Sequence, residues 1–214
     1  MGSLSIPEAL LGETVASQER LQSVVKRLAK EMFYSIDYVG EVPILLCLRE
    51  GAIPFHQDLT RELAKLTFNF ESGWLKTHHH YKGTEGSGDV KVFPYEGPAL
   101  NGRLVVIVED IIDSSETIIR VCDYLDSQKV AQRNISTLLF KERPENIGWR
   151  NTGLDGYRHL PEVRHVGLFI EPLFVVGYGL DYRQFGRDGD EVRVLTPEGQ
   201  VWVDQQVALR GQDA

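Results

Sequence analysis

The sequence predicts an α/β protein with a central, mainly parallel sheet flanked by helices. Three short, mostly apolar β runs indicate the central strands, and helical patterns separate them along the chain: residues 44–48, 104–108 and 135–140, the last of which includes Ser136 and Thr137. A strand of a parallel sheet is covered on both faces, so it reads as a continuous apolar run rather than as an alternation. The length of 214 residues suits one domain with a sizeable core and room for a small appended subdomain.

The first half of the chain alternates between helix and strand. Residues 18–34 place apolar side chains on one face at helical spacing, which predicts an amphipathic helix. The strand 44–48 follows Pro43 and ends at a glycine turn. We expect a helix over 53–66, a strand over 67–75 and a polar, glycine-punctuated loop over 78–90.

The second half continues this alternation. After the strand 104–108 comes a helix that runs through Leu125, with a buried stripe of Ile118, Ile119, Val121, Cys122 and Leu125. The strand 135–140 ends at a Lys-Glu-Arg segment. Residues 144–165 are expected to be irregular, and residues 173–180 form the last strong β run.

Composition excludes some classes of function. The net charge of −8 argues against a protein that coats nucleic acid. Cys47 and Cys122 lie within apolar patterns without a nearby ligand partner, which indicates buried, reduced thiols and a cytoplasmic protein. The N-terminus has no signal-sequence pattern, and no apolar run approaches the ~18 residues that span a bilayer, so we expect no membrane association.

Polar residues follow each predicted strand and are expected to share one rim of the sheet. Ligands of parallel sheets gather at the carboxyl ends of the strands, where the loops converge. The residues that this rule brings together are Arg49, Glu50, Gly51, Glu109, Asp110, Asp113, Lys141 and Asp181.

The segment VIVEDIIDSSETI, residues 106–118, contains the strongest indication of a ligand. Asp113 to Thr117 form a short loop before a helix, where free N–H groups and hydroxyls make an anion site. By itself, Asp113 or Ser114 could simply cap the helix. The pair Glu109-Asp110 is harder to explain in this way, since acids beside a core strand need donors, a metal or a hydroxylated ligand.

This segment resembles the phosphoribosyl pyrophosphate (PRPP) signature of the type I phosphoribosyltransferases. Four further segments are similar to those of the hypoxanthine-guanine phosphoribosyltransferases: LLCLREGA to the pyrophosphate loop, HHYKGTEGSGDV to the mobile lid, LLFKERP to the base-contacting lysine segment, and FVVGYGLDYRQFGRD to the carboxy-terminal purine and pyrophosphate segment. Their order and rough spacing hold over about residues 40–195.

The resemblance implies roles for the residues of the PRPP signature. Glu109 and Asp110 would bind the ribose hydroxyls, with Mg²⁺ close by, and Asp113 would face purine N7 as the catalytic proton acceptor or donor. The 5′-phosphate would be held by Ser114, Ser115, Glu116 and Thr117. The family often has glycine or alanine at the place of Ser115, so a left-handed conformation there would cost the serine ~1 kcal/mol.

It also implies roles outside the signature. Pyrophosphate would be bound by Leu48, Arg49, Gly51 and Arg187, with a cis peptide expected at Leu48-Arg49. The purine would be bound by Lys141 at its 6-oxo group, by Phe174 through stacking and by Val175 through backbone atoms. Asp181 lies in the same purine segment and would hold a second Mg²⁺, and Tyr81 and Lys82 would form the lid.

The implied activity is purine salvage: Mg²⁺-dependent transfer of the phosphoribosyl group from PRPP to N9 of hypoxanthine or guanine. The implied protein is one domain, 1–214, with a core of about 40–145, and a hood over the site that is built from the N-terminal segment and about 146–205. It would be a homodimer or homotetramer. The alternative is a non-catalytic or regulatory PRPP-binding homologue, in which Glu50, Ser115 and Glu116 mark the loss of turnover.

Overall fold

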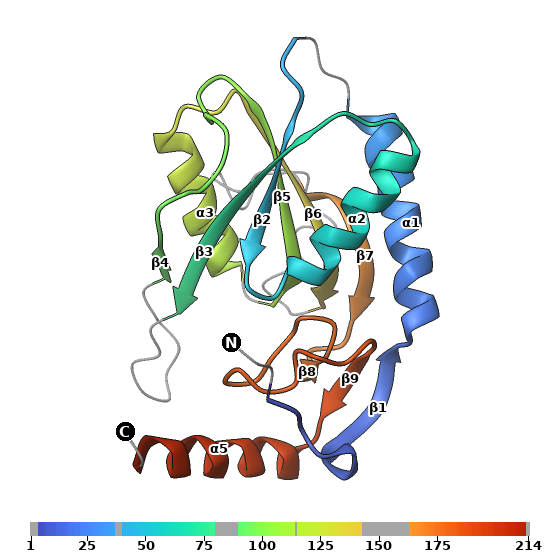
Figure 1. Ribbon diagram of the computed structural model, residues 1–214, viewed down its shortest axis with the longest axis vertical. Helices are drawn as coiled ribbons and strands as arrows, with labels where there is room; N and C mark the ends of the chain where they lie inside the picture. Colours follow the sequence, from blue (N-terminus) through green and yellow to red (C-terminus); the bar gives the residue numbers. More distant parts are fainter. Residues whose placement is uncertain (1–3, 37–39, 80–89, 114, 143–162, 213–214) are drawn as a thin grey trace.

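A six-stranded sheet forms the centre of the protein (Figure 1). The computed structural model describes residues 4–36, 40–79, 90–113, 115–142 and 163–212. Strand order is β4-β3-β2-β5-β6-β7, and every neighbouring pair is parallel except β3 and β4. The strands are β2 (Ile44–Arg49), β3 (Glu71–His79), β4 (Val90–Val92), β5 (Leu104–Ile112), β6 (Gln132–Lys141) and β7 (Val163–Ile170). The predicted fold class is confirmed.

Helices cover both faces of this sheet, which explains the mostly apolar runs of the central strands. Helices α1 (Gln18–Ser35) and α2 (Ile53–Lys65) pack on one face, and α3 (Glu116–Ser127) packs on the other (Figure 1). Each helix buries the apolar stripe that its sequence predicts, although Ile119 of α3 is only partly buried. Two separate apolar cores result, one on each side of the sheet.

The hood is a second, three-stranded sheet with one long helix. It consists of η1 (Glu8–Leu10), β1 (Leu11–Ala16), β8 (Val175–Val176), β9 (Val192–Leu195) and α5 (Pro197–Gln212). Strand β1 pairs antiparallel with β9, so that Leu11 lies opposite Leu195. Figure 1 shows the hood beyond the carboxyl ends of β2, β5 and β6, which is the rim where the sequence predicts a site.

Two predicted boundaries on the β3 side are wrong. The strand begins at Glu71 rather than at residue 67, because α2 ends in a turn in which Thr67 has a positive φ of 57°. The predicted loop 78–90 contains strand at both ends, since His78 lies opposite Lys91 and His79 opposite Val90 in the β3–β4 pair.

The C-terminal third also differs from the prediction. Strand β7 begins at Val163, inside the stretch that was expected to be irregular. The predicted β run 173–180 contains only the two-residue strand β8, because Gly177, Tyr178 and Gly179 all have positive φ and turn the chain back. Both cysteines are free and buried, as predicted. No helix in the described part of the chain is long and apolar enough to cross a membrane.

A buried histidine gives the fold a testable pH dependence. His165 of β7 is 2% exposed, and burial lowers its pKa to about 4. Its Nε2 lies 2.8 Å from Ser35 Oγ at the end of α1. Between pH 6.5 and 4 the unfolded chain takes up a proton that the folded chain does not, so the histidine opposes folding as pH falls.

We therefore expect His165→Gln to flatten the acid side of the stability curve. The contribution of the wild-type histidine is about 3 kcal/mol between pH 6.5 and 4. Urea unfolding at several pH values measures it, and the same substitution at exposed His78 of β3 is the control. Parallel curves for wild type and His165→Gln would show that the pKa of His165 is the same in the folded and unfolded chain.

Candidate functional site

The site lies at the topological switch point of the main sheet. Strands β2 and β5 are neighbours, and from them the chain continues to β3 on one side and to β6 and β7 on the other. Loops diverge at such a point and leave room for a ligand. The turn after β2 and the end of β5 meet there: a Cβ atom added to Gly51 would lie 1.9 Å from Asp110 Oδ2. A side chain at position 51 would therefore displace the Asp110 carboxylate.

The turn after β2 has one non-proline cis peptide, at Arg49-Glu50. The expected position, Leu48-Arg49, is wrong by one residue. Leu48 is buried within β2, whereas Arg49 is the last residue of the strand and is partly exposed. The Arg49 guanidinium lies 3.3 Å from Glu96 Oε2.

Glu109 and Asp110 form a close carboxyl pair near the end of β5. Burial, together with the charge of Asp110, raises the pKa of Glu109 well above its usual value. Burial also raises the pKa of Asp110 to about 6, although backbone hydrogen bonds and Arg187 oppose this. Glu109 Oε2 is buried and has no hydrogen-bond partner among the described residues. Hydroxyl donors or a cation would satisfy both groups.

A magnesium ion fits this pair better than it fits Asp181. Mg²⁺ in proteins is commonly held by one or two carboxylates together with substrate phosphates. The described residues contain no group of three or more acids, histidines or cysteines that could hold a metal by themselves. Both carboxylate oxygens of Asp181 accept from protein donors, Arg187 at 2.6 Å and the Gln184 backbone N–H at 2.6 Å.

The predicted phosphate loop leads directly into α3. Ser115 is the residue before the helix and has right-handed backbone angles, with φ −74° and ψ −1°. The expected cost of a left-handed serine therefore does not arise. Helix α3 begins without a side-chain cap hydrogen bond, and Thr117 lies in its first turn. The start of a helix is a favourable place for an anion. Ser114 lies outside the described residues.

Lys141 is buried and pairs with Asp113. The lysine is the last residue of β6 and is 4% exposed, so it is not a surface lysine. Its Nζ lies 2.6 Å from Asp113 Oδ2, which follows the end of β5. The same Nζ lies 5.6 Å from the centroid of the Phe174 ring. Three residues that were predicted to contact the purine thus lie together.

Phe174 is 38% exposed, which excludes a core role for its ring. Val175, the next residue, has a buried side chain and pairs with Val194 of β9. A second aromatic residue, which the sequence interpretation missed, supports Phe174: the Tyr182 ring lies edge-on at 4.9 Å. The Tyr182 hydroxyl is 3.1 Å from Asp204 of α5.

At the pyrophosphate end, Arg187 is surrounded by acceptors. Its guanidinium bonds Asp181 at 2.6 Å and lies 3.7 Å from Glu50. Glu50 is also 2.9 Å from Lys76 of β3, and this hydrogen bond, with the nearby arginine charges, lowers the pKa of Glu50. Lys76 was missed, because only the β2–β3 pairing brings it here. Tyr81 and Lys82, the predicted lid residues, lie outside the described residues.

Fold and site define an α/β protein with a carboxylate pair and the start of a helix at the switch point of its parallel sheet. Residues 13–152 match the family model described as a phosphoribosyl transferase domain. The chain belongs to this family.

Two sequence relatives show which kind of phosphoribosyltransferase this chain is similar to. The chain is 29% identical over 191 residues to the hypoxanthine-guanine phosphoribosyltransferase of Staphylococcus aureus, covering 88% of this chain and 96% of that protein. It is 30% identical over 186 residues to the bifunctional protein TilS/HprT of Listeria innocua, covering 87% of this chain but only 26% of that protein.

Solved structures show the same fold. The crystal structure of a hypoxanthine phosphoribosyltransferase from S. aureus superposes with a TM-score of 0.71 at 26% identity, over 89% of this chain and 94% of that one. The Trypanosoma cruzi hypoxanthine phosphoribosyltransferase in complex with IMP has a TM-score of 0.72 at 23% identity, over 92% and 96% of the two chains.

Glu116 provides a local test of the phosphate loop. The residue is exposed in the first turn of α3, where the helix dipole favours an acid. We expect Glu116→Lys to lower the midpoint of urea unfolding slightly and to leave the KM for PRPP unchanged. A KM that falls, with a gain that shrinks as salt rises, would instead place this carboxylate beside the bound phosphate.

Proposed function

We propose that the protein transfers the 5-phosphoribosyl group of PRPP to N9 of hypoxanthine or guanine, releasing pyrophosphate and forming IMP or GMP. The pairing of Lys141 with Asp113 carries this proposal. O6 and N7 are neighbours on one edge of a 6-oxopurine, the first an acceptor and the second able to carry a proton. A buried ammonium beside a carboxylate, next to the half-exposed Phe174 ring, is complementary to that edge.

The reaction breaks the bond from ribose C1′ to pyrophosphate and forms the bond from C1′ to N9. Asp113 would take the proton from N7 as N9 attacks, while Lys141 holds O6. Glu109 and Asp110 would fix the ribose hydroxyls, and the first N–H groups of α3, with Ser114, Ser115 and Thr117, would bind the 5′-phosphate. Arg49, Arg187 and the backbone of Gly51 would hold the departing pyrophosphate.

Mg²⁺ would be held beside Glu109 and Asp110, with Asp181 available for a second ion if Arg187 releases it. When bound, the metal would neutralise negative charge on the pyrophosphate oxygens. The buried Glu109 oxygen that has no partner among the described residues supports this assignment.

The proposal also covers the domain organisation, the oligomeric state and the cellular location of the protein. We infer one functional unit, in which the core of about 40–145 supplies the phosphate half of the site and the hood supplies the purine half. A homodimer or homotetramer in the cytoplasm is the expected form.

The test is direct: the protein is mixed with PRPP, Mg²⁺ and each nucleobase in turn, and nucleotide is measured. We expect product with hypoxanthine or guanine and none with adenine, whose 6-amino group presents a donor to the Lys141 ammonium. Turnover of adenine at a comparable rate would exclude the assignment of Lys141.

A non-catalytic PRPP-binding protein is the second candidate. The observation in its favour is that Glu50 places a carboxylate beside Lys76 and Arg187, two cations at the pyrophosphate end. Such a protein would bind PRPP with Mg²⁺ in calorimetry but form no nucleotide with any base. In the enzyme, Glu50→Gly would leave turnover intact.

A further inference from the structure

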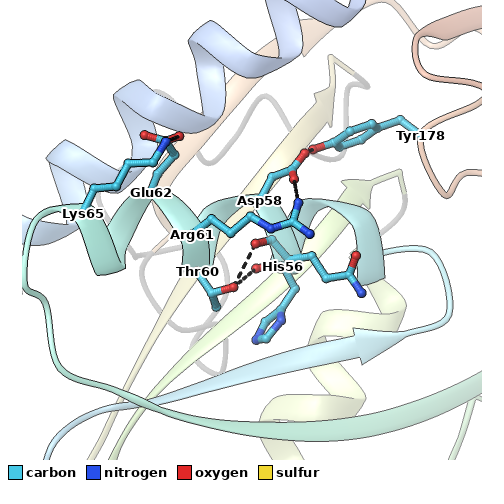
Figure 2. Close-up of polar contacts among 8 residues, drawn as sticks. His56, Asp58, Thr60, Arg61, Glu62, Lys65 and Tyr178 are labelled. Atoms are coloured by element: carbon cyan, nitrogen blue, oxygen red, sulfur yellow. Dashed lines mark hydrogen bonds and ion pairs between the residues drawn. The ribbon is translucent and has the colours of Figure 1, made fainter.

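A side-chain hydrogen bond between Tyr178 of the hood and Asp58 of helix α2, called the strut below, joins the two elements (Figure 2). Tyr178 Oη donates to Asp58 Oδ2 at 2.6 Å, and Arg61 donates to Asp58 Oδ1 at 2.8 Å. Both oxygens of the carboxylate are therefore engaged, one from the hood and one from its own helix. Burial and the hydrogen bond to Asp58 raise the pKa of Tyr178 far above its usual value, so the phenol remains a donor at all physiological pH values.

The backbone at this point is unusual for a tyrosine. Tyr178 has a φ of 52°, between Gly177 at 98° and Gly179 at 97°. The left-handed conformation costs a residue with a side chain ~1 kcal/mol, which glycine would avoid. A tyrosine here needs a compensating interaction, and the bond to Asp58 supplies one.

The same turn of the hood rests on the predicted pyrophosphate loop. A Cβ atom added to Gly179 would lie 2.1 Å from Gly51 O and 2.9 Å from Pro54 Cδ. Gly179 therefore packs against the turn after β2 and the first turn of α2. Asp58 lies one turn further along that helix, so the strut and the glycine contact hold the hood to the same short segment.

Arg187 depends on this turn for its position. Its Nη1 donates to Gly179 O at 2.6 Å, and the Gly179 N–H donates to Arg187 O at 3.0 Å. A cavity of about 260 Å³ lies beside these groups and is lined in part by Gln57, Tyr178 and Arg187. The guanidinium has room to shift if the turn moves.

We propose that Tyr178 and Asp58 are positioning residues for pyrophosphate recognition. They hold Arg187, from the hood, at a fixed separation from the Arg49–Gly51 turn of the core, so that one ligand meets both. The inference rests on the proposed function, because it takes these two elements as the pyrophosphate site. It assigns no ligand contact to either positioning residue.

Tyr178→Phe tests the proposal, since it removes only the hydroxyl. Because the lost hydrogen bond is to a charged group, we expect about a tenfold rise in the KM for PRPP and in the Kd of pyrophosphate with Mg²⁺. The KM for hypoxanthine should change less than about twofold, because Lys141 and Asp113 lie in the core, and Phe174 is supported within the hood by the Tyr182 ring at 4.9 Å and by the Leu195 N–H at 2.8 Å.

Four variants complete the experiment. Thr60→Val is the matched control: it removes a hydroxyl from α2 that bonds only its own helix, at 2.9 Å to His56 O, and should leave the KM for PRPP unchanged (Figure 2). Asp58→Asn keeps an acceptor for Tyr178 and should retain most of the wild-type affinity. Asp58→Ala should match Tyr178→Phe, and the double variant should be no worse than either.

Equal rises of both KM values in Tyr178→Phe would show a general loosening of the fold and overturn the proposal. Unchanged PRPP and pyrophosphate affinity would also overturn it. If the wild type forms no nucleotide, the proposed function fails. Pyrophosphate binding by calorimetry then still tests the strut alone.

Discussion

Lys141→Met should lower kcat/KM for hypoxanthine by about 100- to 1,000-fold while leaving the affinity for PRPP within about threefold of wild type. The substitution keeps most of the apolar stem but removes the ammonium that is 4% exposed and 2.6 Å from Asp113. Two effects add: O6 loses its donor, and the partly exposed Asp113 carboxylate loses its ion pair with a buried ammonium. Steady-state kinetics and PRPP calorimetry measure the two quantities.

Lys65→Met is the control for this variant. Lys65 also pairs with a carboxylate, Glu62 at 2.5 Å, but lies on the exposed side of α2. We expect its kinetics to equal those of the wild type. Equal losses of purine turnover and PRPP affinity in Lys141→Met would contradict a role in reading the base.

Asp113→Asn should have the second large effect, a fall in kcat of about 10²- to 10⁴-fold. The amide has the shape of the carboxylate but cannot accept the N7 proton. It also leaves Lys141 with a neutral partner. PRPP should bind as in the wild type, because Glu109, Asp110 and the start of α3 are unchanged.

Asp126→Asn, at the far end of α3, is the matched control, since Asp126 also pairs with a shielded cation, Arg133. Its kcat should remain at the wild-type value. If Asp113→Asn kept a kcat within threefold of the wild type, proton transfer at N7 would have to be assigned to another group.

The core strands could be predicted from the sequence because burial on both faces leaves a local signal. The run 44–48 is strand β2 almost to the residue, and Lys141 is the last residue of β6. Glu109 and Asp110 were expected to follow their strand, but they lie within β5, which continues to Ile112. The hood left no such signal. Strands β1 and β9 are short and partly exposed, and they are paired across nearly the whole chain. No local pattern indicates such a pairing.

The side-chain pairings at the site also could not be predicted from local sequence patterns. Lys76 and Glu50 are far apart in the sequence, and so are Tyr178 and Asp58. Only the assembled sheet and hood bring the members of each pair together. The sequence therefore indicates which residues share the rim of the sheet, but it does not indicate which of their side chains bond to one another.

The pairing of β1 with β9 has a consequence for biosynthesis. The elements that carry the proposed phosphate-binding residues are synthesised early, since β2, β5 and α3 are complete by Ser127. The purine half must wait, because β1 has no partner until β9 emerges, and closing so long a loop is slow. The first strand of a nascent chain would thus remain an open edge throughout most of its synthesis.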